Sequence, residues 1–227
     1  MSADNQKRAA GEAAALLVED GMTVGLGTGS TAAWFVKALA ARRLNIKGVP
    51  TSEATAQLAR SLGVALVELN DAGPIDLTVD GADEIGPYLA LIKGGGAALL
   101  REKLVWEASR RCVVIADAAK HGGAFGAFPL PVEVVAFGHA TTATRINAAL
   151  TRLGIAASGK LRAKDSEPVR TDNGNLIYDI ACGAINDPRV LADALKHQTG
   201  VVEHGLFLGL AERALIGTDD GVVTIHP

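Results

Sequence analysis

Short apolar runs alternate along the first half of the chain with stretches whose apolar residues recur at helical spacing. The first helical stretch, Asp4 to Asp20, ends before Gly21, a residue type that commonly terminates helices. The run Met22 to Leu26 predicts a strand, which leads through a glycine loop into a helix over Ala32 to Arg43. The alternation continues with strands at 45–50, 64–69, 75–79 and 112–116 and a helix at 51–62. Strands that alternate with helices predict an α/β fold with an open, mostly parallel, Rossmann-like sheet and helices on both faces.

Two prolines, Pro129 and Pro131, mark a change of pattern, because proline does not occupy a central strand. The elements expected beyond them follow the order β-α-β-β-α-β, which predicts a smaller ferredoxin-like α+β domain: strands at 132–135, 155–161, 176–181 and 201–206, helices at 139–153 and 188–197. The tail, Leu215 to Ile225, predicts a hairpin that returns to the first sheet. We therefore expect a catalytic domain of residues 1–128 with 207–227 and a smaller domain of residues 129–206.

Composition narrows the classes of partner. The chain has 227 residues, 48% of them hydrophobic, and a net charge of -3, so it lacks the basic field that nucleic acid requires. No apolar run reaches the length of a membrane span, and we expect a cytoplasmic protein without membrane partners. Cys112 and Cys182 have neither metal-ligand nor disulfide spacing and are expected to be buried thiols.

Candidate chemistry is concentrated between Asp80 and Lys103. Asp80 follows a predicted strand at the carboxyl end, where open α/β sheets place their ligands, and Asp83 lies just beyond a glycine turn. Lys93 leads into the triplet Gly94–Gly96, after which 97–109 is expected to be a helix. These groups are expected to converge on one cleft. Two other interpretations stay open: a solvated acidic turn, or an Asp-x-x-Asp site for magnesium.

Glu102 lies on that predicted helix. A helical wheel places Ala97, Leu100, Leu104 and Ala108 on the apolar stripe and Glu102 beside it, flanked by Ala98, Leu99 and Trp106. Such flanks would partly desolvate the carboxylate, as a general base requires, whereas an ordinary exposed glutamate is the alternative. Arg101 falls within the stripe, where only a snorkelling or paired side chain is expected.

A glycine loop between the first strand and its helix has the character of a phosphate site. The segment Gly25–Thr31 offers backbone N–H groups at a helix N-terminus, and three hydroxyls follow Gly27. Its evenly spaced glycines do not match the G-x-G-x-x-G dinucleotide fingerprint, so a compact monophosphate is favoured, with a merely tight turn as the alternative. Lys120 follows another predicted strand and is either a ligand or a surface lysine.

Together these segments make the chain resemble the type A ribose-5-phosphate isomerase family. Seven motifs carry the resemblance in order: GLGTGSTA at 25–32, TSEAT at 51–55, DGADEI at 80–85, KGGGAAL with REK at 93–103, FPLPVEV at 128–134, TDNGN at 171–175 and GLF at 205–207. The chain departs from the family at Ala119, where a serine is common, and at Ala127, where a basic residue often stands.

The resemblance implies an aldose–ketose isomerase that interconverts ribose 5-phosphate and ribulose 5-phosphate through an enediol, without a cofactor or a metal. It implies that Glu102 is the proton-shuttling base and that Asp80, Asp83 and Lys93 hold the sugar oxygens and assist ring opening. Further substrate contacts are implied for Gly81, Ala82, Gly94, Gly95 and Gly96 around the sugar, and for Thr28, Gly29, Ser30, Thr31, Lys7 and Lys120 around the phosphate.

The resemblance also implies a homodimer or homotetramer in which the second domain acts as a lid or an interface. One alternative function is a sugar-phosphate-sensing domain without turnover, which the glutamate at position 102 argues against. Another is a nucleotide-dependent enzyme, which would need a larger ligand groove.

Overall fold

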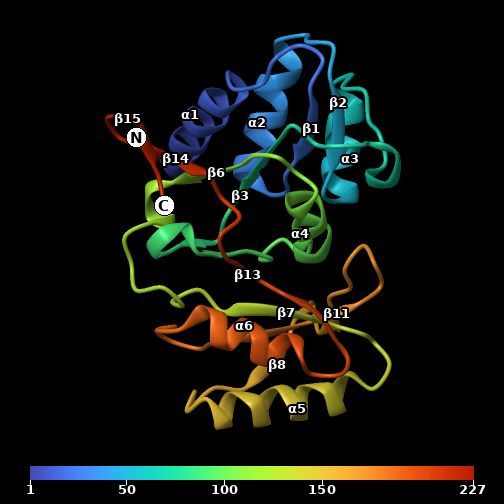
Figure 1. The fold of residues 1–227 in the computed structure, drawn as a ribbon, viewed down its shortest axis with the longest axis vertical. Coiled ribbons are helices and arrows are strands. Elements are labelled where there is room, and N and C mark those ends of the chain that lie inside the picture. The colour runs from blue at the N-terminus through green and yellow to red at the C-terminus, as the bar shows by residue number, and fades with distance from the viewer. The chain divides into compact units, whose positions relative to one another are not determined.

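The computed structural model describes all of residues 1–227, and the chain divides into two compact units (Figure 1). The first unit consists of Met1–Ala82, Arg101–His121 and Gly209–Pro227, and the second of Asp83–Leu100 and Gly122–Leu208. Both units are built from interleaved segments of the chain. The domain boundaries expected from the sequence stay a prediction.

The first unit contains a six-stranded sheet with the order β15-β14-β6-β3-β1-β2. All neighbouring strands in it are parallel except the last pair, β14 and β15, which is antiparallel. The strands are β1 Thr23–Leu26, β2 Lys47–Pro50, β3 Leu77–Gly81, β6 Cys112–Asp117, β14 Arg213–Thr218 and β15 Gly221–Ile225. This topology confirms the predicted open, mostly parallel sheet and the returning tail hairpin.

Helices cover both faces of this sheet, so its central strands β1, β3 and β6 are buried at nearly every position. They are α1 Ala3–Ala15, α2 Ser30–Ala41, α3 Glu53–Ser61 and α4 Leu99–Glu107, with short 3-10 turns at Leu69–Asp71 and Ala118–Lys120. Side chains such as Val24, Leu26 and Val79 face α1 and α2, which lie side by side (Figure 1). On the opposite face, Val105 of α4 packs with Val49 and Ile75.

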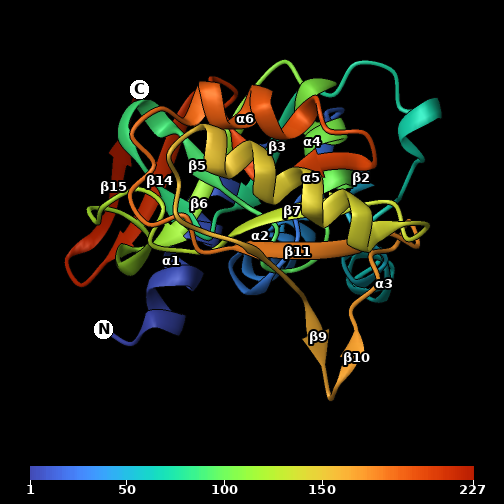
Figure 2. The ribbon, with the colours of Figure 1, turned by 90° about the horizontal axis from the view of Figure 1, so that it is seen from below.

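The second unit is built on a four-stranded antiparallel sheet with the order β12-β7-β11-β8. Its strands are β7 Leu130–Val134, β8 Gly159–Leu161, β11 Leu176–Ile180 and β12 Val201–His204, and its helices are α5 His139–Arg152 and α6 Pro188–Lys196. The two helices lie side by side against this sheet (Figure 2) and share one apolar core with it. The connectivity and strand order confirm the ferredoxin-like α+β arrangement.

Short elements complete the second unit. A three-stranded sheet has the order β13-β5-β4, formed by β4 Glu84–Ile85, β5 Leu91–Ile92 and β13 Leu206–Phe207, with a 3-10 turn at Pro87–Leu89. The hairpin of β9 Ala163–Lys164 and β10 Glu167–Pro168 extends away from the other strands of the unit (Figure 2). The sequence did not predict this hairpin.

Two secondary-structure predictions were wrong. Residues 64–69 do not form a strand of the sheet: Leu66 makes only an isolated bridge to Gly48 beside the edge strand β2. The wheel drawn for 97–109 has the wrong phase: Leu104, placed on the apolar stripe, is 48% exposed, whereas Leu99 and Val105 are buried. The helix itself is shorter than predicted, since α4 covers only Leu99–Glu107.

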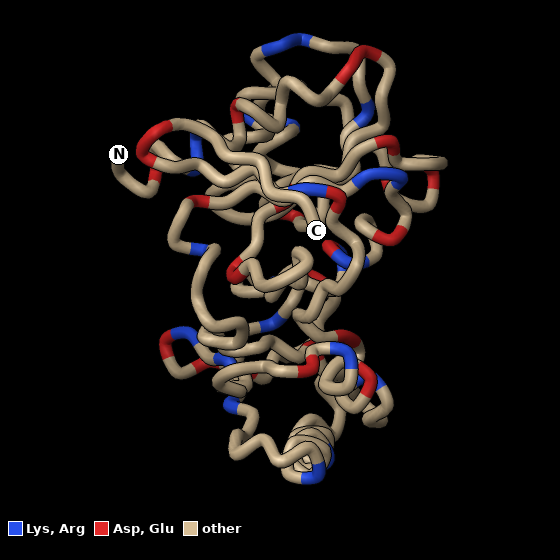
Figure 3. Tube along the Cα trace, turned by 60° about the vertical axis from the view of Figure 1, so that its left-hand side comes forward, with Lys and Arg blue, Asp and Glu red and all other residues tan.

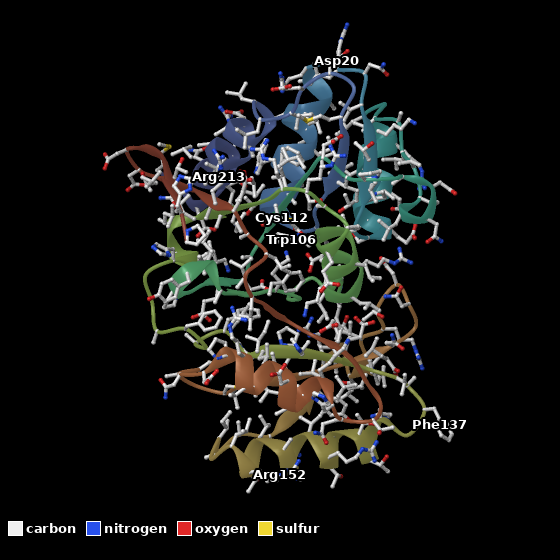
Figure 4. The ribbon with its side chains drawn as sticks, viewed as in Figure 1. Asp20, Trp106, Cys112, Phe137, Arg152 and Arg213 are labelled. Atoms are coloured by element: carbon white, nitrogen blue, oxygen red, sulfur yellow. The ribbon has the colours of Figure 1, made fainter.

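Other expectations concern charge, membranes and thiols. Acidic and basic positions are interspersed along the chain (Figure 3), consistent with a net charge of only -3. None of the helices combines the length and the apolar character of a membrane-spanning segment. Cys112 is buried beside Trp106 (Figure 4), to whose carbonyl its thiol donates over 3.4 Å, whereas Cys182 is only half-buried, contrary to expectation. Burial raises the pKa of Cys112 to about 12 and that of Cys182 to about 11.

Candidate active site

Among the candidate residues of the first unit, Asp80 is a buried carboxylate held by several hydrogen-bond donors. It is fully buried at the end of β3, where its Oδ1 accepts hydrogen bonds from the N–H groups of Thr28 at 3.0 Å and Gly81 at 2.7 Å. Its Oδ2 lies 3.3 Å from Nε1 of Trp106. Donors from the glycine loop, from β3 and from α4 therefore hold one carboxylate in one orientation.

Gly27 allows this close approach between the loop and Asp80. A Cβ at position 27 would lie 2.2 Å from Oδ1 and 2.5 Å from Cα of Asp80, far inside ordinary contact distance. Gly29 has a φ of 107° and serves as the N-cap of α2, so it also needs the freedom of glycine. The glycines of the loop thus bring it against the carboxylate and direct it into a helix N-terminus.

The hydroxyl of Thr28 joins a cluster that the sequence analysis missed. Its Oγ1 lies 2.7 Å from Oγ1 of Thr51, 2.8 Å from Oγ of Ser52 and 3.2 Å from Oγ1 of Thr55. Thr55 in turn donates to the carbonyl of Gly27 at 2.9 Å. The hydroxyls of the TSEAT segment therefore hold the glycine loop in place through Thr28 and the carbonyl of Gly27.

Lys7 brings a positive charge to the same loop from α1. Its Nζ lies 3.1 Å from Oγ of Ser30, the exposed first residue of α2, and 3.9 Å from Oδ2 of Asp117 at the end of β6. Lys120 follows on the 3-10 turn that Asp117 caps through the N–H of Ala119. Since β1, β3 and β6 are parallel, their carboxyl ends place these groups at one edge of the sheet.

Glu102 lies on the inward side of α4 and is only 4% exposed. It precedes Trp106 by one helical turn, so both side chains lie on the same face of the helix, the face from which the indole reaches Asp80. Arg101 pairs with Glu53 on α3 at 2.8 Å, which explains its position on the helix and lowers the pKa of the Glu53 carboxyl. The predicted general base is thus buried within the first unit.

The remaining candidates belong to the second unit, whose first residue is Asp83. Oδ2 of Asp83 accepts the N–H of Gly95 at 2.7 Å. Lys93 is 2% exposed, its N–H donates to the carbonyl of Gly205, and its Nζ lies 5.5 Å from the centre of the Phe207 ring. Gly94 has a φ of 107°, and a Cβ there would meet the side chain of Leu99 at 2.8 Å. The glycine triplet is therefore a tight turn tied to Asp83.

Glu84 has a structural role instead of a place among the ligands. Its buried carboxylate accepts the N–H groups of Gly126, Ala127 and Phe128 at 3.0, 3.4 and 2.9 Å. It thereby anchors the segment that leads into β7. No group of three or more His, Cys, Asp or Glu side chains is arranged to hold a metal ion.

Comparisons with known proteins agree on one family. Residues 47–221 match the model of ribose 5-phosphate isomerase A (phosphoriboisomerase A). The chain is 67% identical to ribose-5-phosphate isomerase A of Caulobacter sp. (strain K31), over the full length of both. Its fold is similar to ribose 5-phosphate isomerase from Plasmodium falciparum, with a TM-score of 0.92, 35% identity and 99% of each chain covered. It is equally similar, with a TM-score of 0.91, 34% identity and full coverage of both chains, to a D-ribose-5-phosphate isomerase solved in complex with phospho-erythronic acid.

Proposed function

The chain belongs to the ribose 5-phosphate isomerase A family, and from this membership we propose which of its residues perform the isomerisation. It is a ribose-5-phosphate isomerase of the pentose phosphate pathway, which interconverts ribose 5-phosphate and ribulose 5-phosphate. The observation that carries this assignment is the 67% identity over the whole chain. The sugar-phosphate sensor without turnover, the alternative raised by the sequence, has no observation in its favour.

The phosphate is bound by the loop that ends in the N-terminus of α2. The N–H groups of Gly29, Ser30 and Thr31 point out of the first helical turn, where the helix dipole favours an anion. Lys7, 3.1 Å from the Ser30 hydroxyl, adds a cation, and Lys120 is a second one at the same sheet edge. The Thr28 hydroxyl already belongs to the cluster with Thr51, Ser52 and Thr55, so Thr28 contributes to the phosphate site by fixing the position of the loop.

Glu102 transfers the proton. In the open-chain aldose the Glu102 carboxylate removes the proton from C2, and the C1 oxygen takes up the negative charge of the enediolate. The same carboxyl group returns a proton to C1, while the proton of the C2 hydroxyl passes to the C1 oxygen, so that C2 becomes the carbonyl of the ketose and the C1 oxygen becomes a hydroxyl. The position of Glu102 supports this role, because its side chain is only 4% exposed and lies on the face of α4 from which Trp106 reaches Asp80.

The other charged residues stabilise the sugar oxygens. Asp80, fixed by three donors, and Asp83 accept hydrogen bonds from sugar hydroxyls and assist ring opening. Lys93 and the N–H groups of Gly94 and Gly96 stabilise the enediolate, while the N–H of Gly95 holds Asp83 in place. Gly81 and Ala82 line the sugar from the end of β3. Phospho-erythronic acid, held by a relative of the same fold, carries a phosphate and a carboxylate, and so presents two anionic ends as the phosphorylated enediolate does.

No metal or cofactor takes part in this mechanism, since the proton is carried by a carboxylate and the charge is met by lysine and backbone donors. We further propose that the enzyme forms a homodimer or homotetramer and works in the cytoplasm, where phosphorylated sugars are kept. Light scattering on purified protein will measure the oligomeric state. If no metal is needed, activity should survive prolonged treatment with a chelator.

Glu102→Gln tests the central assignment. The amide keeps the size of the side chain but cannot accept a proton, so kcat should fall by ~10²–10⁴-fold while KM and the melting temperature stay close to wild type. Glu107→Gln, an exposed glutamate on the same helix, is the matched control and should retain full activity. Solvent deuterium should enter the sugar at C1 or C2 during wild-type turnover. Retention of more than a few percent of kcat in Glu102→Gln would move the base to Asp80 or Asp83.

A further inference from the structure

The glycine turn of the second unit is held by an arginine that no sequence motif contains. Nη1 of Arg162, the residue after β8, donates to the carbonyl of Gly94 at 2.8 Å and to that of Gly95 at 3.2 Å. The rest of the guanidinium is bound by Asp179 of β11, with Nε 2.9 Å from Oδ2 and Nη2 2.5 Å from Oδ1. One ion pair therefore fixes two successive peptide groups of the turn.

Because of peptide geometry, the contact between Arg162 and the two carbonyls also fixes the direction of the N–H groups in the turn. In a trans peptide the C=O and N–H bonds point in opposite directions. Both carbonyls point to the same nitrogen of Arg162, so the N–H groups of Gly95 and Gly96 point away from it. The N–H of Gly95 meets Oδ2 of Asp83 at 2.7 Å, as this geometry requires. Arg162 thus sets both the carboxylate of Asp83 and the direction of the Gly96 N–H.

The planar fork of arginine is what this arrangement needs. Two edges of the guanidinium face different partners, a bidentate carboxylate and a pair of carbonyls, and a single ammonium cannot serve both. The pair is also shielded: the side chains of Arg162 and Asp179 are 15% and 27% exposed. A cation at the carbonyl oxygens polarises the peptides and strengthens their N–H groups as donors.

We propose that Arg162 and Asp179 are positioning residues for the isomerisation: they orient the Gly94–Gly96 turn so that Gly96 N–H and Asp83 meet the sugar oxygens that change charge. This inference rests on the proposed function of the turn, and it assigns no direct substrate contact to Arg162. Its effect belongs to the transition state, since the donors become most valuable as the enediolate forms.

Three substitutions test the pair by steady-state kinetics on the full chain. Arg162→Ala should lower kcat by ~10–100-fold with little change in KM, because donors displaced by about 1 Å lose that much rate while the phosphate loop stays intact. Arg162→Lys should rescue poorly, and Asp179→Asn should lie between wild type and Arg162→Ala. Inhibition by phospho-erythronic acid should weaken in parallel with kcat/KM, and added guanidinium ion should restore part of the activity of Arg162→Ala.

Arg170→Ala is the matched control, since Arg170 also donates to a glycine carbonyl, that of Gly174 at 3.0 Å, in a different turn of the same unit. Full kcat in Arg162→Ala, or an equal loss in Arg170→Ala, would overturn the proposal. If Arg162→Ala does not fold, Arg162→Lys is the deciding variant. A folded Arg162→Lys protein with wild-type kcat would refute the positioning role of Arg162 and Asp179, and a folded protein with lowered kcat would support it. Glu102→Gln separates this proposal from the assignment of the general base. An active Glu102→Gln enzyme together with an impaired Arg162→Ala enzyme would refute Glu102 as the base but would leave the positioning role of Arg162 and Asp179 intact.

Discussion

Gly27→Ala is expected to disable the enzyme by displacing Asp80. The added Cβ would lie 2.2 Å from Oδ1, 2.4 Å from Cγ and 2.5 Å from Cα of Asp80, whereas ordinary contacts begin near 3.4 Å. A rotamer change of Asp80 could relieve the first two contacts but not the third, because Cα belongs to the backbone of β3. The loop and the strand must therefore separate by roughly 1 Å, and the N–H of Thr28 moves away from the carboxylate it now meets at 3.0 Å.

The expected cost has two parts. Overpacking of this kind destabilises by about 1–3 kcal/mol, which corresponds to a fall of about 2–12 °C in the melting temperature of a chain of this size. A shift of about 1 Å in a binding carboxylate costs ~10²-fold in kcat/KM. The loss of activity should therefore greatly exceed what the residual stability explains.

The measurement combines a thermal melt with kinetics at a temperature where the variant is fully folded. Gly123→Ala is the control, because a Cβ at position 123 meets no atom within 4 Å and its φ is not positive. It should match wild type in both assays. If Gly27→Ala keeps the wild-type melting temperature and kcat/KM, the loop can accommodate a Cβ at position 27 without displacing Asp80, and the prediction is wrong.

Three further predictions follow from single side chains. Lys93→Arg should rescue the activity lost in Lys93→Ala poorly, because the planar guanidinium cannot replace a compact ammonium in a site that is 2% exposed; wild-type rates would exclude a direct role. The hydrogen bond from Arg111 lowers the pKa of Glu212, so the stability of this pair is present above the ordinary carboxyl pKa and is lost as pH falls through the lowered value. Denaturation midpoints at decreasing pH should thus converge between wild type and Glu212→Gln. With pKa values of about 12 and 11, Cys112 and Cys182 stay protonated, and a thiol reagent at neutral pH should label the native protein far more slowly than the unfolded chain.

The sequence predicted the fold well where apolar periodicity is strong. The strands of both sheets and the returning hairpin are confirmed, since their short apolar runs are buried at nearly every position of the central strands β1, β3, β6 and β7. Residues 64–69 have the same local character but lie beside an edge strand, where only Leu66 forms a bridge. Strand propensity alone does not show whether a partner is available on both sides.

The site was harder to predict in detail than the fold. The phase of α4 was wrong because Leu99, Leu100 and Leu104 allow several apolar stripes, and because the buried face also carries Glu102 and Lys103. Functional sites break the pattern on which such predictions depend. The supporting roles of Arg162 and the Thr55 hydroxyl had no signal in the sequence, since they depend on contacts to backbone carbonyls of residues distant in sequence: Gly94 and Gly95 for Arg162, and Gly27 for Thr55.

The interleaving of the two units has a consequence for synthesis on the ribosome. Strand β6 is apolar and buried in the finished sheet, yet its neighbour β14 starts at Arg213, after the whole of the second unit. At about 5–20 residues per second, the edge of β6 stays without its partner for roughly 5–20 s while the chain between them is translated. The nascent protein must therefore shield an aggregation-prone strand edge until its last residues emerge.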